Sequence, residues 1–183
     1  MTVPGITVFG QQSHPDWTAG TPIAEDATGF PTDYVALDLE TTGFYPNRCA
    51  ITEIGAVRVR GGRVVDQFQQ LINPLCPIPR QITALTGITD AMVADHDPID
   101  GVLPQFISWL ADSNAAAETE PIVGHNVSFD LRFLDYNTRH IAGCGFACAD
   151  YDTMQISRAL FPKQSHHRLA DLIVRFGIAD NEE

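Results

Sequence analysis

The chain has 183 residues, with 11 Lys and Arg against 23 Asp and Glu, so its formal net charge is −12. This length suits one domain with a substantial core. The acidity argues against a long basic groove for duplex nucleic acid, since Lys163 is the only lysine and the arginines are scattered along the sequence. It argues less against a site for a few nucleotides at a strand end. Neither a membrane-spanning apolar run nor a secretory signal is evident, so we expect a cytoplasmic protein with no membrane partner.

Residues 1–30 are rich in Gly, Pro, Thr and Ser and predict a flexible leader before a domain over 31–183. Three β-prone runs open this domain, at 34–39, 51–60 and 63–68. Gly61 and Gly62 separate the second run from the third and are typical of a hairpin turn. We therefore expect three consecutive strands, the second antiparallel to both neighbours.

Helical patterns dominate the rest of the chain. Pro79 suits a first helical position, with Ile82 and Leu85 facing inward and Gly87 ending the helix. An acidic linker at 114–120 precedes one more short strand, at 121–124. Further helices are predicted near 90–94, over 101–113, from 126 or 128 to 140, over 152–161 and over 168–176. This order favours an α/β fold with a mixed sheet flanked by helices.

The four cysteines match no common metal-binding spacing. We expect reduced, partly buried thiols, because free cysteine tends to be buried. The four are Cys49, Cys76, Cys144 and Cys148.

Two acids stand at the end of the first predicted strand. Because side chains alternate across a strand, Asp38 and Glu40 point the same way and Leu39 the other. Neighbouring carboxylates repel unless a cation or proton intervenes, and oxygen ligands of this kind suit Mg²⁺ or Mn²⁺. A solvated acidic strand end explains the pair alone equally well. The following Thr41-Thr42-Gly43 either holds a phosphate or sugar or is an ordinary strand exit.

A third acid follows the predicted strand at 121–124. The segment Gly124-His125-Asn126-Val127-Ser128-Phe129-Asp130 places Asp130 in the first turn of a helix, where the helix dipole favours an anion. Ligands gather where strand ends meet helix starts in such sheets. Taken singly, Asn126 as a plain N-cap and Asp130 as an ordinary first-turn acid are the better interpretations.

In combination, these motifs resemble one family. The ordered set closely resembles the DEDDh exonucleases, nearest to the proofreading subunits of bacterial DNA polymerase III. The resemblance spans about 34–178 and implies an RNase H-like fold, with a mixed five-stranded sheet flanked by helices, and removal of nucleotides from a 3′ end. The motifs that carry it are Asp38 to Gly43, Ile54 to Val57, Thr86 to Thr89, Gly124 to Asp130, Asp152 to Met154, Arg158 to Pro162 and His167 to Leu172.

The resemblance also implies roles for single residues. Asp38, Glu40 and Asp130 match the acids that bind two divalent cations, Mg²⁺ or Mn²⁺, which activate a water and stabilise the leaving 3′ oxygen. Phe44 is either a base-stacking residue or a core or rim aromatic. Implied partners are single-stranded DNA 3′ ends and a DNA polymerase catalytic subunit. The implied substrate-binding set is Thr41, Thr42, Gly43, Phe44, Asn126 and Phe129.

The family completes its site with a His and, five positions later, an Asp. His166 and Asp171 have this spacing. Because Asp171-Leu172 and Phe176-Gly177-Ile178 resemble the segment before that motif, we favour a final motif beyond Glu183 and a domain truncated at its C-terminus. We then expect the 183-residue chain to be weakly active or inactive, since base catalysis alone contributes about 10²–10⁴ in rate.

We expect hydrolysis of DNA 3′ ends in proofreading or repair. An RNA exonuclease of the same superfamily is an alternative, because sequence alone does not reveal contacts to a 2′-hydroxyl. A catalytically defunct nucleic-acid-binding domain is a second alternative. The missing final motif favours it, and the intact Asp38, Glu40 and Asp130 disfavour it.

Overall fold

The computed structural model describes residues 31–111 and 120–178. The predicted leader, most of the predicted acidic linker and the predicted final motif lie outside the described residues. No helix within the described ranges is long and apolar enough to cross a bilayer.

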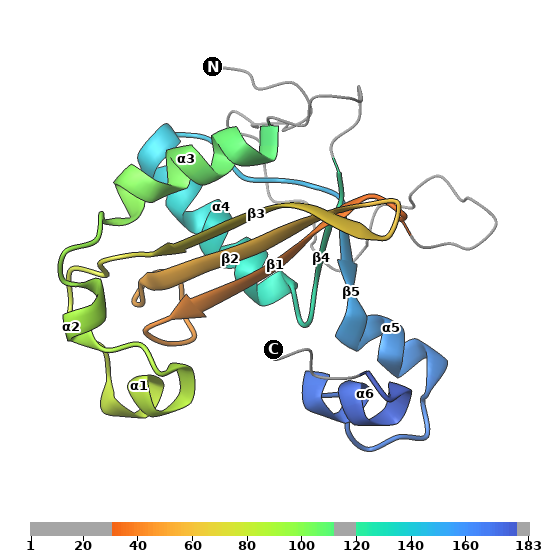
Figure 1. Cartoon of the computed structure of the whole chain (residues 1–183). Coiled ribbons are helices and arrows are strands. Elements are labelled where there is room, and N and C mark those ends of the chain that lie inside the picture. Colours follow the sequence, from red (N-terminus) through yellow and green to blue (C-terminus); the bar gives the residue numbers. More distant parts are fainter. Residues whose placement is uncertain (1–30, 112–119, 179–183) are drawn as a thin grey trace.

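A mixed five-stranded sheet in the order β3-β2-β1-β4-β5 forms the centre of the fold (Figure 1). The first three strands form an antiparallel meander, and β4 and β5 run parallel to β1. The predicted hairpin and fold class are therefore confirmed. The strands are β1 Tyr34–Thr41, β2 Ile51–Arg60, β3 Arg63–Leu71, β4 Ile122–Gly124 and β5 Asp150–Asp152. Among these strands, β5 was the one that the local sequence patterns did not predict. Its three residues form no apolar run, and they become a strand by pairing with β4.

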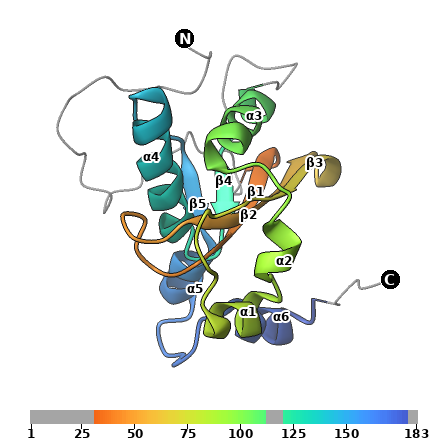
Figure 2. The same ribbon diagram turned by 90° about the vertical axis from the view of Figure 1, so that its left-hand side faces the viewer.

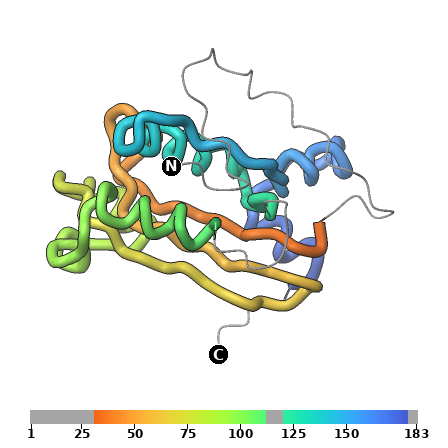
Figure 3. Tube along the Cα trace, turned by 90° about the horizontal axis from the view of Figure 1, so that it is seen from above, coloured from red at the N-terminus to blue at the C-terminus, as the bar shows by residue number. Residues whose placement is uncertain are grey.

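Helices lie on both faces of this sheet. Viewed from the side and from above, α3 and α4 cover one face, whereas α5 and α6 lie below the other (Figures 2 and 3). The helices are α1 Arg80–Thr86, α2 Asp90–Val93, α3 Ile99–Ala111, α4 Ser128–Ala142, α5 Thr153–Leu160 and α6 Leu169–Phe176.

The main core fills the space between the sheet and the pair α3 and α4. Alternate residues of β1 point into it, and this alternation turns Asp38 and Glu40 towards the opposite face, as predicted. Burying these apolar side chains is what holds α4 against β1. The cluster includes Val35, Leu37, Leu39, Val102, Phe106, Leu131 and Leu134.

Two details of the first helix differ from the sequence prediction. Pro79 is the N-cap, and α1 begins one residue later, at Arg80. Leu85 is exposed rather than inward-facing, because residues before and after α1 already fill the small cluster beneath it. That cluster consists of Ile78, Ile82, Ile88 and Val93.

All four cysteines are free thiols, as predicted. Three are at least partly buried, but Cys76 is exposed. Burial, aided by the nearby Asp150, raises the pKa of the Cys148 thiol to about 12, so this sulfur is an unreactive packing group.

Candidate active site

Asp130 is anchored to β1 between the two acids of the first motif. β4 pairs with β1 only at Val35 and Ala36, and β1 continues beyond that pairing. There the backbone N–H of Leu39 donates a buried hydrogen bond of 3.1 Å to Oδ1 of Asp130. Because Leu39 lies between Asp38 and Glu40 in the sequence, this bond brings the three predicted acids to one place.

The turn from β4 into α4 makes this approach possible. A Cβ on Gly124 would lie 2.8 Å from Cγ2 of Val127 and 3.0 Å from the carbonyl oxygen of Leu37, so only glycine fits. Asn126 then adopts a left-handed backbone, with φ of 62°, and its N–H donates to Oδ1 of Asp152 at 2.9 Å. The N-cap interpretation of Asn126 is therefore wrong: this turn places it one residue before the cap position, which is Val127.

Like charges crowd the three acids. Asp130 is only 3% exposed, and burial, followed by Asp38, raises its pKa to about 7 against the opposing hydrogen bond from Leu39. Partial burial and Asp38 also raise the pKa of Glu40. Partial burial and Glu53 raise the pKa of Asp38. Such a cluster is stabilised by a bound cation or by a proton.

Glu53 is a fourth carboxylate that the sequence analysis missed. It stands directly opposite Glu40 in the ladder between β1 and β2. One of its oxygens accepts a hydrogen bond of 2.8 Å from the side chain of Gln69. The register between β1 and β2 would have identified Glu53, because pairing Leu39 with Ile54 places Glu53 opposite Glu40.

His125 is the imidazole beside these acids, and its charged form opposes the rise in the pKa of Asp38. Its Nδ1 lies 3.0 Å from Oγ1 of Thr153, and that hydroxyl donates to the carbonyl oxygen of Gly124 at 3.2 Å. Since Thr153 has one hydroxyl proton and donates it to the carbonyl, it accepts from Nδ1–H of the histidine.

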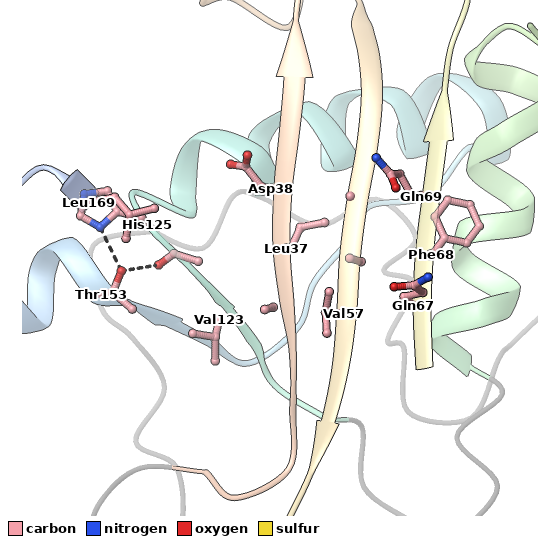
Figure 4. A pocket seen from close by; sticks show the side chains of 14 residues that line it. Leu37, Asp38, Val57, Gln67, Phe68, Gln69, Val123, His125, Thr153 and Leu169 are labelled. Atoms are coloured by element: carbon pink, nitrogen blue, oxygen red, sulfur yellow. Dashed lines mark hydrogen bonds between the residues drawn. The ribbon is translucent and has the colours of Figure 1, made fainter. Parts of the chain in front are cut away.

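A hollow of about 450 Å³ opens beside Asp38 on the face of the sheet that α3 and α4 leave free. Figure 4 shows Asp38 in the middle of its lining, between His125, Thr153 and Leu169 on one side and the β3 residues 67–69 on the other. The small residues Ala36, Gly55 and Ala56 form part of its floor. The acid site is therefore open to a ligand from this face.

Hydrogen bonds made by the side-chain hydroxyls of Thr41 and Thr42 stabilise the loop after β1. Oγ1 of Thr41 donates to the carbonyl oxygen of Gly43 at 2.7 Å, and Oγ1 of Thr42 accepts from the N–H of Ala50 at 3.0 Å. A Cβ on Gly43 would lie 2.8 Å from Sγ of Cys49. Both threonines are buried, so their hydroxyls hold the turn, and Gly43 is needed for packing on Cys49.

The other predicted substrate-binding residues differ in exposure. Phe44 is 72% exposed, which excludes its interpretation as a core aromatic. Asn126 is exposed at the turn before α4. Phe129 is half-buried and packs on Phe133, with ring centroids 5.1 Å apart. Phe44 thus lies in the loop after β1, Asn126 in the turn before α4 and Phe129 in the first turn of α4.

His166 and Asp171 are not brought to the acids. The carboxylate of Asp171 accepts from the backbone N–H of Arg168 at 3.1 Å and from its guanidinium at 2.9 and 3.0 Å. This pairing closes the first turn of α6 and lowers the pKa of Asp171 to about 2. His166 is exposed on the segment before α6. The structure therefore gives Asp171 a capping role and favours the interpretation that it is not the final acid.

The donor set suits a hard divalent cation, because it consists of carboxylates with raised pKa values on a site open to a ligand. Within the described ranges, no three His, Cys, Asp or Glu side chains already lie close enough together to hold one ion. An ion held by Asp38, Glu40 and Asp130 together would need these carboxylates to come closer to one another.

Comparison with solved structures defines the class of fold. Exonuclease X in complex with 5′ overhanging duplex DNA superposes with a TM-score of 0.62 at 28% identity, over 81% of this chain and 75% of that one. The fold is thus that of the RNase H-like exonucleases.

The family follows from the sequence. Residues 35–183 match the model of the Exonuclease family, RNase T type, and the chain belongs to this family. It is 33% identical over 148 residues to the DNA polymerase III subunit epsilon of Aquifex aeolicus, covering 81% of this chain and 70% of that subunit. It is 35% identical over 156 residues to the DNA polymerase III PolC-type of Thermotoga maritima, covering 85% of this chain but only 11% of that polymerase.

Proposed function

We propose that this domain hydrolyses nucleotides from DNA 3′ ends with the help of divalent cations. The observation that carries the proposal is the buried Asp130, tied to the backbone of β1 between Asp38 and Glu40. Asp38 lines the open hollow, and Asp38 and Glu40 together raise the pKa of the buried Asp130, so the site has an excess of negative charge. Divalent cations would offset this charge and would in turn bind the oxygens of a phosphodiester.

Asp38, Glu40 and Asp130 would hold two ions, Mg²⁺ or Mn²⁺. Bound there, the ions would lower the pKa of an attacking water and stabilise the leaving 3′ oxygen. The hydrogen bond from Leu39 would hold Asp130 in place as the other two carboxylates approached the ions. Burial of Asp130 strengthens its attraction to a cation, because few water dipoles screen the charge.

The terminal nucleotide would lie against the loop after β1. Phe44 is exposed and suited to stack on a base, and the turn through Thr41, Thr42 and Gly43 would offer its backbone to the sugar and phosphate. Asn126 and Phe129 would border the same nucleotide from the start of α4.

DNA is the substrate we favour over RNA. The relatives described above are named as parts of DNA polymerase III, and exonuclease X was solved with duplex DNA. Association with a polymerase catalytic subunit is part of the same proposal and rests on the names of those relatives.

Degradation of 5′-labelled single-stranded DNA with Mn²⁺ tests the proposal, beside an Asp38→Ala control and a matched RNA strand. We expect a metal-dependent ladder of shortened DNA that the control does not produce. Faster degradation of RNA than of DNA would instead make RNA the preferred substrate. Metal-dependent binding without any ladder would favour a catalytically defunct binding domain.

A further inference from the structure

The helical hairpin formed by α5, α6 and their connection, residues 153–178, differs in charge from the rest of the molecule. We call it the α5–α6 hairpin. It contains four of the 11 Lys and Arg residues but only one of the 23 Asp and Glu residues, Asp171. The cations are Arg158, Lys163, Arg168 and Arg175. The hairpin therefore carries an excess of positive charge within a strongly acidic protein.

Most of these cations are not neutralised within the described part of the chain. Arg168 is paired with Asp171. Arg158 and Lys163 are exposed, and no described carboxylate forms an ion pair with either. Outside the hairpin, Arg58, Arg60 and Arg139 are bound to carboxylates, whereas the other four described arginines form no ion pair with a described carboxylate. What distinguishes the hairpin is therefore its excess of cations over acids.

Arg175 is a third cation without a carboxylate partner among the described residues. Its guanidinium lies 5.2 Å from the ring centroid of Phe161, and one nitrogen donates weakly to the carbonyl oxygen of His166 at 3.4 Å. The other terminal nitrogen, Nη1, is buried and has no hydrogen-bond partner. The aromatic ring holds this guanidinium in place, and no described carboxylate neutralises its charge.

The α5–α6 hairpin borders the acid site. Thr153, the first residue of α5, and Leu169, the first residue of α6, line the same hollow as Asp38 (Figure 4). In Figure 1 both helices lie below the end of β5, beside the free face of the sheet. A polyanion whose end reached Asp38 from this face would pass the α5–α6 hairpin, in which Lys and Arg outnumber Asp and Glu by four to one.

We propose that the α5–α6 hairpin binds the phosphates of the nucleic-acid strand whose 3′ end occupies the acid site, through Arg158, Lys163 and Arg175. This inference rests on the proposed function. The remainder of the chain carries seven Lys and Arg against 22 Asp and Glu, so it repels a phosphodiester backbone. A local set of unpaired cations gives the strand a favourable path and releases its condensed counterions.

The salt dependence of binding tests this directly. We would measure the Kd of the full chain for 5′-fluorescein-labelled dT12 in Ca²⁺ buffer between 50 and 300 mM NaCl. The variant Arg158→Gln/Lys163→Gln is compared with Arg63→Gln/Arg139→Gln. The control changes net charge equally, but its residues lie at the β2–β3 turn and in the last turn of α4. Both pairs keep the Arg175 packing intact.

Each phosphate contact contributes about 0.7 to the slope of log K against log salt for single strands. We therefore expect the hairpin variant to lose about 1.4 from that slope and to bind about 25-fold more weakly at 0.1 M salt. The control variant should stay close to the wild type.

Equal slopes for the hairpin variant and the wild type would overturn the inference while leaving the proposed function intact. Equal losses in the two variants would also overturn it, because the effect would then come from net charge. Failure of the wild type to bind dT12 at all would remove the proposed function and this inference together.

Discussion

Two charged side chains, Arg58 and Asp130, are each only 3% exposed, and their surroundings differ completely. Arg58 donates to Asp66 at 3.2 Å, to Glu120 at 2.7 Å and to the carbonyl oxygen of Trp109 at 2.6 Å. Its guanidinium also lies 4.2 Å from the centre of the Trp109 ring. Asp130 accepts a hydrogen bond from Leu39, and its neighbours Asp38 and Glu40 have the same charge as its own.

The difference separates a structural charge from a functional one. Arg58 has its charge and donors satisfied by the protein, so it joins α3 to the hairpin of β2 and β3 and needs no ligand. Asp130 is left without a compensating cation in the described part of the chain. A buried charge of this kind is tolerated where a proton or metal ion supplies the balance.

Asp130→Asn should have the largest effect, on activity. The substitution keeps the shape of the side chain but removes the proposed metal ligand. Charge stabilisation by a bound metal is worth several kcal/mol, so we expect about a 10³-fold slower release of nucleotides. The measurement is the initial rate of single-strand degradation in Mn²⁺. Asp135→Asn is the matched control on the same helix, since that side chain pairs with Arg139. Equal losses in both variants would contradict the assignment.

Arg58→Met should chiefly affect stability. It leaves Glu120, whose side chain is 11% exposed, without one of its two cations. Breaking a buried pair in this way destabilises a protein by about 3–5 kcal/mol, which urea unfolding would measure. Arg60→Met, which removes the more exposed partner of the same carboxylate, should cost only about 1 kcal/mol. Comparable losses from the two substitutions would show that the burial of Arg58 is unimportant.

Stability without metal should fall as pH rises. The pKa of Asp130 is raised to about 7 in the folded protein, above its value of about 3.9 in an unfolded chain. The contribution of protonated Asp130 to the free energy of unfolding is thus fully present below about pH 4 and is lost as pH rises through about 7. Its upper bound is about 4 kcal/mol. Thermal unfolding in EDTA at several pH values measures it. Asp130→Asn should flatten the profile, and an unchanged profile would refute its origin in Asp130.

Glu53→Gln should have the smallest effect. Glu53 raises the pKa values of Asp38 and Glu40 without contacting Asp130 in the described interactions. Removing its charge should lower both pKa values and change Mn²⁺ affinity at pH 6 by only a few fold. Loss of Mn²⁺ binding in calorimetry would instead make Glu53 a fourth metal ligand.

The meander and the helices could be predicted because each depends on local patterns, whereas the joint role of the three acids was inferred from the family resemblance. Alternation along β1 sets the direction of Asp38 and Glu40, and the glycine of the β4–α4 turn signals a close approach. The burial of Arg58 could not be predicted in this way, since its partners Asp66 and Glu120 lie on other segments. The side-chain roles of Thr41 and Thr42 likewise depend on Gly43 and Ala50 in the folded loop.

Binding of Mn²⁺ to the chain, followed by the electron paramagnetic resonance signal of the free ion, tests the account most directly. The uncompensated charge of Asp130 predicts saturable binding that is about tenfold tighter at pH 8 than at pH 6, because the acid must lose its proton first. Asp130→Asn should lose this binding, and Asp135→Asn should retain it. Equal Mn²⁺ affinity in wild type and Asp130→Asn would contradict the claim that the buried acid is the centre of a metal site.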